Sequence, residues 1–278
     1  MSALRIIYNN LFDDYDTLTQ LFGSTAGGFP MTNLIDDTKS KTWRSTDLLS
    51  PKIKVTWAAS QTLSAVALPF CNLIAGSTFQ ITLYDATSGG TLLLDTGVVD
   101  VDYSYDAPIG FTSIGSASYA YGGGANVAAF FAQTAGVRRM EIEFTSAGNP
   151  DGYIEISRII AGAYWEPEKG ASYGAGIAFV DSTSGARTSA GGLITDRGTI
   201  HREMSFTLGA MNAGDRSALN NLFRSIGKSQ PLFISLTPGE SNDEGELYGQ
   251  IYGKIADDIS VDFAFYRNYS SQIKIAEV

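Results

Sequence analysis

Apolar and polar residues alternate along much of this chain with the two-residue period of a half-buried strand. Ile53, Val55 and Trp57 fall on one side of such a segment, and the same alternation runs through residues 79–84 and 140–144. Side chains of a strand point to opposite faces in turn, so these segments predict a sheet with one buried face and one wet face. Further strands are predicted at residues 4–8 and 154–157.

The alternation weakens between residues 95 and 136, where a Tyr-rich segment leads into the Gly-rich string SIGSASYAYGGGANVAAFFAQ. Glycine favours turns because it lacks a Cβ atom. We therefore expect a Tyr/Gly-rich insertion near 95–136, at the surface, with a short helix over 126–133. The string WEPEKG at 165–170 combines Pro, Gly and charge, as exposed connections do. It predicts a domain boundary, with one domain over residues 1–166 and another over 167–278.

The second part of the chain contains the clearest helix pattern. Apolar residues recur at helical spacing over 219–226, Asn212 or Asp215 can cap the start, and Gly227 stands where a helix stop is expected. Strands are predicted around this helix near 212–226, at residues 199–208, 231–237, 247–255, 259–266 and 271–276. The second part is therefore expected to be an α+β domain with one packed helix.

Composition supports a folded, mainly β protein: 44% of the residues are hydrophobic, 12% are aromatic and 30 are glycines. The net charge of −10 argues against nucleic-acid binding, which lysine and arginine normally drive. No apolar run reaches the roughly 18 to 20 residues of a membrane-spanning helix, so the sequence predicts neither a membrane span nor a secretion signal. Cys71 is the single cysteine and has no partner for an internal disulfide.

Several strings carry a resemblance to a known family. The order Asn33-Leu34-Ile35-Asp36, then Trp43-Arg44-Ser45, then a strand resembles discoidin or galactose-binding-like jelly rolls, and RRMEIEF with GYIEISRIIAGAYWEP looks like their closing strands. This resemblance covers roughly half of the chain. It implies a fold class that is mainly β: an N-terminal jelly-roll β-sandwich (galactose-binding-like) followed by a smaller α+β domain.

The remaining half resembles the C-terminal parts of tail-tip or baseplate proteins of tailed bacteriophages. The resemblance is carried by GARTSAGGLITDRGTIHREMSF, a strand pair before a helix, by the turn Gly227-Lys228-Ser229-Gln230-Pro231, and by the closing hairpin. It implies a virion tail component that is assembled in the cytoplasm of a host bacterium. Its implied partners are other tail or baseplate proteins and copies of itself.

Sugars are bound by an aromatic face and by planar polar side chains. Asp36, Asp37, Trp43 and Arg44 in one loop are residues of these types, and they form the candidate carbohydrate-binding site. The alternative is an internal brace, in which the Trp43 ring covers the end of the sandwich and the Arg44 guanidinium pairs with a carboxylate. In the insertion, tyrosines supply contact area for a protein partner or a glycan, with subunit contact preferred; they are Tyr103, Tyr105, Tyr119 and Tyr121.

Catalytic chemistry finds little support in the sequence. His201 is the one histidine and lies in an expected strand, which leaves neither a nucleophile-histidine pair nor a zinc site. Gly227-Lys228-Ser229 resembles the end of a P-loop, but Leu222 stands where that loop needs glycine. Aspartates cluster near 13–16, 36–37, 95–106 and 257–262. No cluster has the spacing of a calcium loop, although modules resembling this jelly roll often hold a structural calcium ion.

Three hypotheses follow. The first is a structural subunit of a bacteriophage tail tip or baseplate that acts through subunit contacts, with no catalytic residue, no cofactor and no resident metal. The second is a carbohydrate-binding adhesin that contacts a host-surface glycan through the Trp43 loop. The third is a glycan-cleaving hydrolase, for which the sequence offers only carboxylates.

Overall fold

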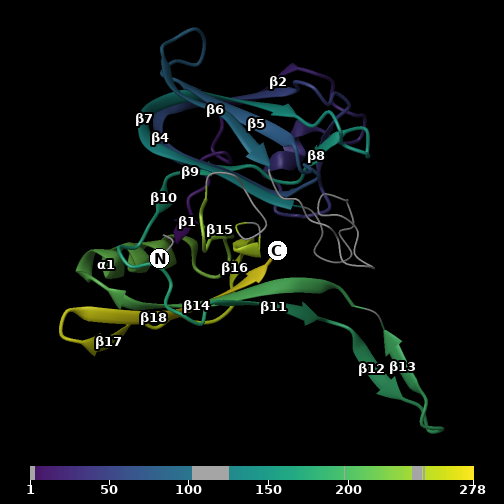
Figure 1. Cartoon of the computed structure of the whole chain (residues 1–278), viewed down its shortest axis with the longest axis vertical. Coiled ribbons are helices and arrows are strands. Elements are labelled where there is room, and N and C mark those ends of the chain that lie inside the picture. The colour runs from purple at the N-terminus through teal and green to yellow at the C-terminus, as the bar shows by residue number, and fades with distance from the viewer. Residues whose placement is uncertain (1–3, 102–124, 197, 240–245, 247) are drawn as a thin grey trace.

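The computed structural model describes residues 4–101, 125–196, 198–239, 246 and 248–278. In this part of the chain two large sheets lie one above the other, and a single α-helix packs beside the second (Figure 1). The expected fold class, mainly β with a jelly-roll sandwich and an α+β unit holding one packed helix, is confirmed. No helix among the described residues is long and apolar enough to cross a bilayer.

The first sheet forms the sandwich and has the strand order β3-β8-β4-β7-β5-β6, with β2 and β9 paired to β4. A short 3-10 helix, η1 (Met31–Ile35), precedes β3. The strands are β2 (Thr17–Phe22), β3 (Trp43–Ser45), β4 (Lys52–Cys71), β5 (Ser77–Tyr84), β6 (Leu92–Val101), β7 (Ala125–Thr145), β8 (Ile154–Ile156) and β9 (Ile160–Gly162).

Two long strands, β4 and β7, pair along most of their length and curve together (Figure 1). The register shifts near residues 56–65 of β4, and Ala58, Ala59 and Ser60 are exposed at this irregular stretch. Beyond it, residues 63–71 are buried on both faces. Leu63, Val66 and Leu68 enter the core of the sandwich, whereas alternate residues face the second sheet. The alternation of the sequence predicts one wet face for this sheet, and over residues 63–71 that prediction is wrong because the second sheet covers it.

Two expectations for residues 95–136 are corrected. The segment expected to be a helix at 126–133 belongs to β7, because Val127, Ala128 and Ala129 pair with the buried half of β4. This tertiary pairing outweighs the weak helix preference of an Ala-rich segment. Both ends of the predicted insertion are strands of the sandwich as well, since residues 95–101 belong to β6 and residues 125–136 to β7.

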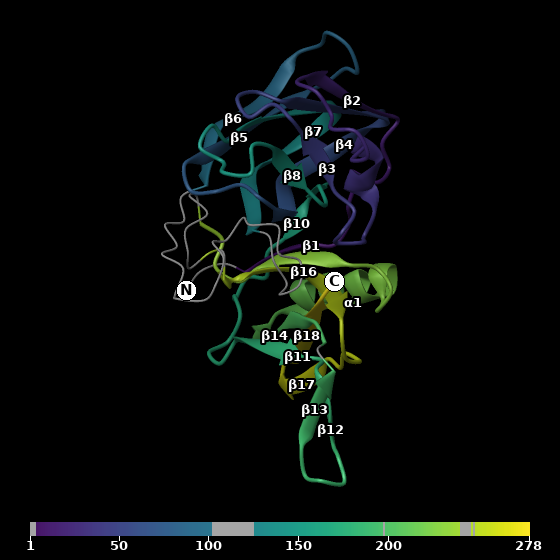
Figure 2. The same cartoon turned by 90° about the vertical axis from the view of Figure 1, so that its right-hand side faces the viewer.

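The second sheet has the strand order β10-β1-β15-β16-β18-β14-β11, with β17 paired to β18. Its strands are β1 (Arg5–Ile7), β10 (Tyr164–Trp165), β11 (Gly176–Asp181), β14 (Ile200–Met211), β15 (Leu232–Ser235), β16 (Gln250–Ile255), β17 (Asp262–Phe265) and β18 (Asn268–Glu277). Between β11 and β14 a separate hairpin, β12 (Ser184–Arg187) with β13 (Leu193–Asp196), projects from the body; we call it the arm (Figures 1 and 2).

The expected helix is confirmed as α1 (Ala213–Ile226). At its start Asn212 and Asp215 form a capping box, in which each side chain accepts a hydrogen bond from the other residue's backbone N–H. At its end Gly227 adopts a φ of 54°, as expected for a helix stop. Leu219, Leu222 and Ile226 are buried against the second sheet in a core of their own.

The two sheets meet at a junction built by the alternation of three adjacent strands. Ile6, Ile234 and Ile251 are register partners that point into the core beside α1. Their neighbours on β1, β15 and β16 point the other way and pack on the sandwich. The junction is the apolar cluster formed by Ile7, Phe233, Tyr252, Ala65, Ala67, Phe70, Ala128 and Ile160.

Polar contacts surround the junction. The Lys39 ammonium lies 4.0 Å from the centre of the Phe70 ring and 3.9 Å from the Glu277 carboxylate. Burial, partly offset by Glu277, lowers the pKa of Lys39 to about 8. Gly162 passes so close to the carbonyl oxygen of Asn9 that a Cβ atom would overlap it, so only glycine fits there.

The domain boundary near residue 166 stays a prediction, but the sheets divide the N-terminal part of the chain differently. β1 pairs with β15 and β10, so residues 5–7 belong to the second sheet, outside the sandwich. The sandwich strands, residues 17–162, lie in sequence between β1 and β10, which are hydrogen-bonded neighbours. The sandwich is therefore inserted into the second sheet through two adjacent connections.

Candidate functional site

Trp43 lies in the core of the sandwich. Its side chain has no exposed surface, its ring packs 6.1 Å from that of Phe144, and its Nε1 donates a hydrogen bond to Thr25 Oγ1 at 3.2 Å. A buried ring offers no face for a sugar to stack on. The expectation that Trp43 contacts a glycan is thereby corrected in favour of the internal brace.

Arg44 completes this brace. Its guanidinium lies between the rings of Phe29 and Tyr153, at 3.9 and 3.8 Å from their centres. Nη2 donates to the Glu155 carboxylate at 3.2 Å, and Glu155 is only 3% exposed. Cation-π contact on both faces together with a buried ion pair fixes this side chain in place.

Asp36 and Asp37 are adjacent in sequence but have different partners. Asp36 accepts hydrogen bonds from Lys41 Nζ at 2.6 Å and from the Thr38 backbone N–H at 2.8 Å. These bonds hold the pKa of Asp36 well below its usual range. Asp37 instead contacts Arg158 and Tyr252. The four residues of the predicted carbohydrate site are therefore not brought together.

Asp37 leads to a cleft between the sandwich and the second sheet. The cleft has a volume of about 330 Å³ and receives side chains from the turn after β1, from the β8–β9 connection and from β16. Its polar lining includes Asn10, Asp13, Asp37, Arg158 and Gln230. Because both sheets contribute, the cleft forms only when the two are packed together.

A hydrogen-bonded network lies at the base of the cleft. Arg158 Nη2 contacts Asp13 at 2.6 Å and Asp37 at 3.1 Å. The Tyr252 hydroxyl donates to Asp37 Oδ1 at 2.7 Å and accepts from Arg158 Nε at 3.3 Å. The Arg158 side chain is 4% exposed, whereas those of Asp13 and Asp37 are 39% and 41% exposed. The buried Arg158 and Tyr252 thus fix the two carboxylates, and each carboxylate keeps part of its surface exposed to solvent in the cleft.

Protonation in this network follows from burial and charge. Burial raises the pKa of Tyr252, so its hydroxyl stays protonated and donates to Asp37. Burial also raises the pKa of Asp13, against the opposing effect of the Arg158 guanidinium. Fixed donors and acceptors at the base of a cleft can bind a polyhydroxylated ligand. Among the described residues no group of three or more His, Cys, Asp or Glu side chains could hold a metal ion.

The arm is a second candidate site, of a different kind. All eight residues of β12 and β13 are exposed, and Leu193 and Ile194 expose 61% and 64% of their surface. Their register partners across the hairpin are Arg187 and Ala186. A two-stranded hairpin alone is at best marginally stable in water, and exposed apolar side chains on it indicate a contact surface.

The other predicted residues are placed as follows. Tyr103, Tyr105, Tyr119 and Tyr121, predicted to make subunit contacts, lie outside the described residues. His201 lies on β14, opposite Val180 of the edge strand β11. Cys71 is buried, and burial raises the pKa of its thiol to about 12.

Most residues of the cleft, and the exposed residues at the tip of the arm, are not predicted from the sequence. Asp13 was noted only as a member of an acidic cluster, and Arg158 and Tyr252 were not singled out. Arg158 follows a strand of buried residues in the string EISRII, an unusual place for arginine. This unusual position is the one feature of the sequence that could have identified Arg158 as a candidate functional residue. Leu193 and Ile194 stand together between turn residues and carry no periodic pattern that would mark them as exposed.

Comparisons with known proteins concern the fold. No protein-family model matches the chain. No curated protein matches it either. Among solved structures it is similar to chitosan-binding module 1 of a chitosanase/glucanase from Paenibacillus sp. IK-5, at 17% identity, over 56% of this chain and 99% of that chain, with a TM-score of 0.38.

Two further solved structures show a likeness of the same extent. One is the CBM32-5 module from Clostridium perfringens in complex with GalNAc-β-1,3-galactose, at 10% identity, over 56% of this chain and 100% of that chain, with a TM-score of 0.39. The other is a Streptococcus pneumoniae fucose binding module, at 12% identity, over 55% of this chain and 95% of that chain, with a TM-score of 0.36.

Proposed function

We propose that this chain is a structural subunit of a bacteriophage tail tip or baseplate, and that it acts through contacts with copies of itself and with other tail proteins. The observation that carries the assembly role is the arm. A projecting hairpin with two exposed large aliphatic side chains gains stability when a partner covers it. The tail context rests on the sequence resemblance of the second half.

The proposed role also implies where the protein acts and that it catalyses no reaction. The subunit belongs to the virion tail tip and is assembled in the cytoplasm of the host bacterium. It makes and breaks no bond, so purified protein that cleaved a host polysaccharide would contradict this part.

The assembly role is tested by removing the arm. Residues 183–198 are replaced by a short Gly-Ser link between Ser182 and Thr199, whose backbones already meet through a hydrogen bond of 3.1 Å. We expect the full chain to associate with rising concentration in sedimentation experiments. The armless variant should stay monomeric with an unchanged unfolding midpoint. A full chain that is monomeric at every concentration, or an armless variant that associates equally well, would contradict the proposal.

A second candidate function is binding of a glycan in the cleft, which the position of Asp37 favours. Its carboxylate is part of the fixed network yet 41% exposed toward the cleft, and Gln230 adds a planar polar group to the lining. Such groups pair with sugar hydroxyls. This proposal replaces the Trp43 loop as the contact surface and keeps a host-surface glycan as the ligand.

Adjacent residues give a matched test on a glycan array. Asp37→Ala removes an acceptor from the cleft, whereas Asp36→Ala removes a carboxylate that pairs with Lys41 outside it. We expect the wild type and Asp36→Ala to retain a glycan signal that Asp37→Ala loses. Equal signals from both variants, or no signal from the wild type, would rule this candidate out.

A further inference from the structure

The arm has two apolar faces near its tip. Leu193 and Ile194 are consecutive in β13, so their side chains point to opposite faces of the hairpin. Across from Ile194 stands only Ala186, whose short side chain leaves Ile194 uncovered. A surface that covers the tip would therefore have to enclose it, as a hollow does.

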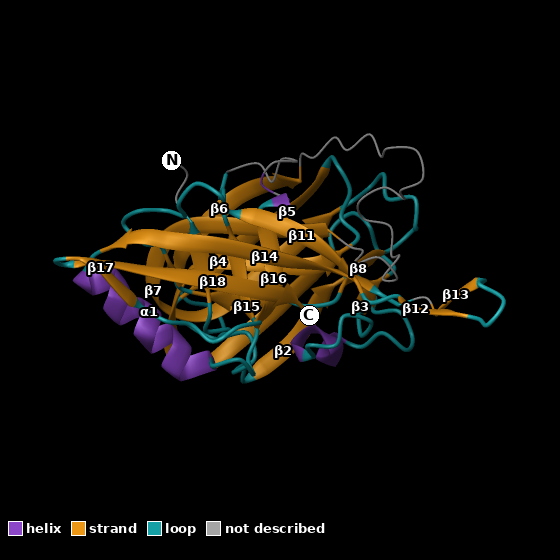
Figure 3. Cartoon of the chain, turned by 90° about the horizontal axis from the view of Figure 1, so that it is seen from below, coloured by secondary structure: helices purple, strands orange, loops and turns teal. Residues whose placement is uncertain are grey.

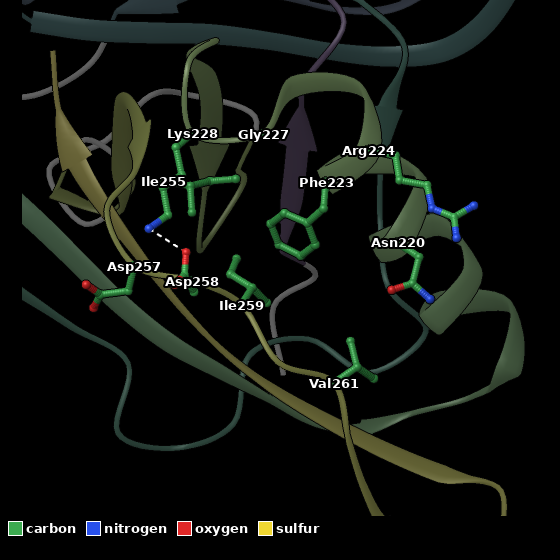
Figure 4. A pocket seen from close by; sticks show the side chains of 10 residues that line it. All are labelled: Asn220, Phe223, Arg224, Gly227, Lys228, Ile255, Asp257, Asp258, Ile259 and Val261. Carbon is green, nitrogen blue, oxygen red and sulfur yellow. Dashed lines mark ion pairs between the residues drawn. The ribbon is translucent and has the colours of Figure 1, made fainter.

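A hollow of suitable kind lies beside α1. It has a volume of about 440 Å³ and lies between the C-terminal half of α1 and the segment that follows β16. Phe223, Ile255, Ile259 and Val261 give it apolar walls, and Figure 4 shows Ile259 next to the Phe223 ring, with Val261 set apart from them. Its volume falls in the range of pockets that hold a ligand or an inserted side chain.

The arm and the hollow lie far apart in one molecule. The arm projects at one end of the second sheet, while α1 and β17 lie at the other (Figures 1 and 3). A copy therefore does not place its arm in its own hollow. Contact between an arm and a hollow has to join two copies, with different surfaces of each taking part, and such a head-to-tail contact repeats into a ring or a filament.

Charge at the two surfaces is complementary at one end of the hollow. Arg187 stands at the tip of the arm, opposite Leu193, and is exposed. The rim of the hollow carries both signs of charge: Arg224 lies at one end, and Asp257, Asp258 and Lys228 lie at the other, where Asp258 pairs with Lys228 at 2.6 Å (Figure 4). Asp257 is exposed at this end of the rim, so a basic tip is favoured there and disfavoured at the Arg224 end, which sets the orientation of the contact.

We propose that the tip of the arm of one copy docks in the hollow beside α1 of the next copy, with Leu193 and Ile194 inserted and Arg187 facing Asp257. This inference rests on the proposed function as an assembling subunit. It adds the partner, which is a second copy of this chain, and the two surfaces that meet.

Cysteine cross-linking tests the pairing directly, because the native Cys71 is buried and does not compete. One protein carries Ile194→Cys and a second carries Val261→Cys. Mixed and mildly oxidised, they should form a disulfide-linked heterodimer on a non-reducing gel, since a disulfide requires Cα atoms within about 7 Å of each other. The matched control replaces Val261→Cys by Leu49→Cys, an exposed position on the sandwich, and should give no heterodimer.

Each other outcome overturns the inference. If Ile194→Cys links mainly to itself, the arms of two copies pair with each other. If the chain sediments as an oligomer but the mixture forms no heterodimer, the arm docks on another surface, and only this inference fails. If the chain is monomeric throughout, the proposed assembly role fails with it.

A charge exchange provides a second measurement. Arg187→Glu and Asp257→Lys should each weaken association by about two- to fivefold at low salt, and the double variant should restore part of the loss. Both positions are exposed, so neither change should shift the unfolding midpoint. An unchanged association constant in both single variants would contradict the placement of Arg187 against Asp257.

Discussion

At the scale of single residues, the burial of Trp43 and the contacts of Arg44 distinguish between two roles, sugar binding and an internal brace, that their residue types allow equally. Trp43 and Arg44 have the right chemistry for a sugar and for a brace, and their sequence context is the same for both. The structure gives Trp43 no exposed surface and places Arg44 between two rings, beside the buried Glu155. The types of these two residues therefore indicate which contacts they can make, but only the structure shows which contacts they do make.

We expect Trp43→Ala to lower the free energy of unfolding by about 3–5 kcal/mol, because it leaves a cavity in the core of the sandwich. Chemical denaturation measures the change. Leu49→Ala, at a position 67% exposed, serves as the control and should stay within about 0.5 kcal/mol of the wild type. A Trp43→Ala protein as stable as this control would show that the ring does not brace the sandwich.

Lys39 gives a prediction for the dependence of stability on pH. Its pKa falls from 10.5 in the unfolded chain to about 8 in the fold, so between these values the unfolded state binds the extra proton. Stability from this group therefore rises with pH across that window and is constant below it. Relative to Lys39→Met, the wild type should gain up to about 1.4 kcal/mol per pH unit between pH 8 and 10.5.

Denaturation at several pH values measures this difference. Lys169→Met removes an exposed lysine and is the matched control; its difference from the wild type should not vary with pH. A Lys39→Met curve parallel to that of the wild type from pH 8 upward would contradict the burial of this ammonium.

At the scale of elements, local signals predicted the helix well and the long strands less well. Asn212, the apolar spacing of α1 and Gly227 act within one segment, so the sequence contains all that is needed to place the helix. β7 was missed over residues 126–133 because its identity depends on pairing with β4, which lies far away in sequence. The burial of residues 63–71 on both faces likewise depends on the second sheet.

Leu222→Asp should lower the free energy of unfolding by several kcal/mol, because it places an unpaired charge in the core beside α1 where Leu222 is 2% exposed. It should also abolish assembly, since the hollow is built on this helix. Asn221→Asp adds the same charge one residue earlier, at an exposed position, and should be nearly neutral. A folded, assembling Leu222→Asp protein would refute the placement of this core.

The residues of the cleft also depend on contacts between distant parts of the chain, which local sequence patterns do not indicate. Asp37 could be singled out from sequence because it stands in a polar loop, but its partners Arg158 and Tyr252 come from two other parts of the chain. Nothing local to either residue indicates that they meet. The cleft forms where the two sheets pack together. The periodicity of a segment predicts whether that segment is a helix or a strand, but not which distant segment it packs against.

At the scale of the whole molecule, the junction joins the two sheets into one unit. Ile7, Phe233 and Tyr252 pack on Ala67 and Phe70, and two adjacent connections link the sandwich to the second sheet. Relative motion of the sheets would expose this apolar cluster and break the network of Arg158. The molecule should therefore behave as one body.

Calorimetry tests this. We expect a single thermal transition whose calorimetric and van't Hoff enthalpies agree, because neither sheet keeps its junction face covered when the other unfolds. Tryptophan fluorescence should report the same midpoint, since Trp43 and Trp57 lie in the sandwich and Trp165 in the second sheet. Two resolved transitions would mean that the junction is weaker than its apolar packing implies.

The pairing of β1 with β15 has a consequence for how the protein is made. Residues 5–7 leave the ribosome early, whereas their partners at 233–235 emerge only after the whole sandwich has been translated. Once the sandwich is complete, Ile6 and Ile7 can pair with the short strand β10 on one side, but their other edge still lacks β15. Chaperones and proteases therefore meet an N-terminal strand with one unpaired edge until residues 233–235 have been translated.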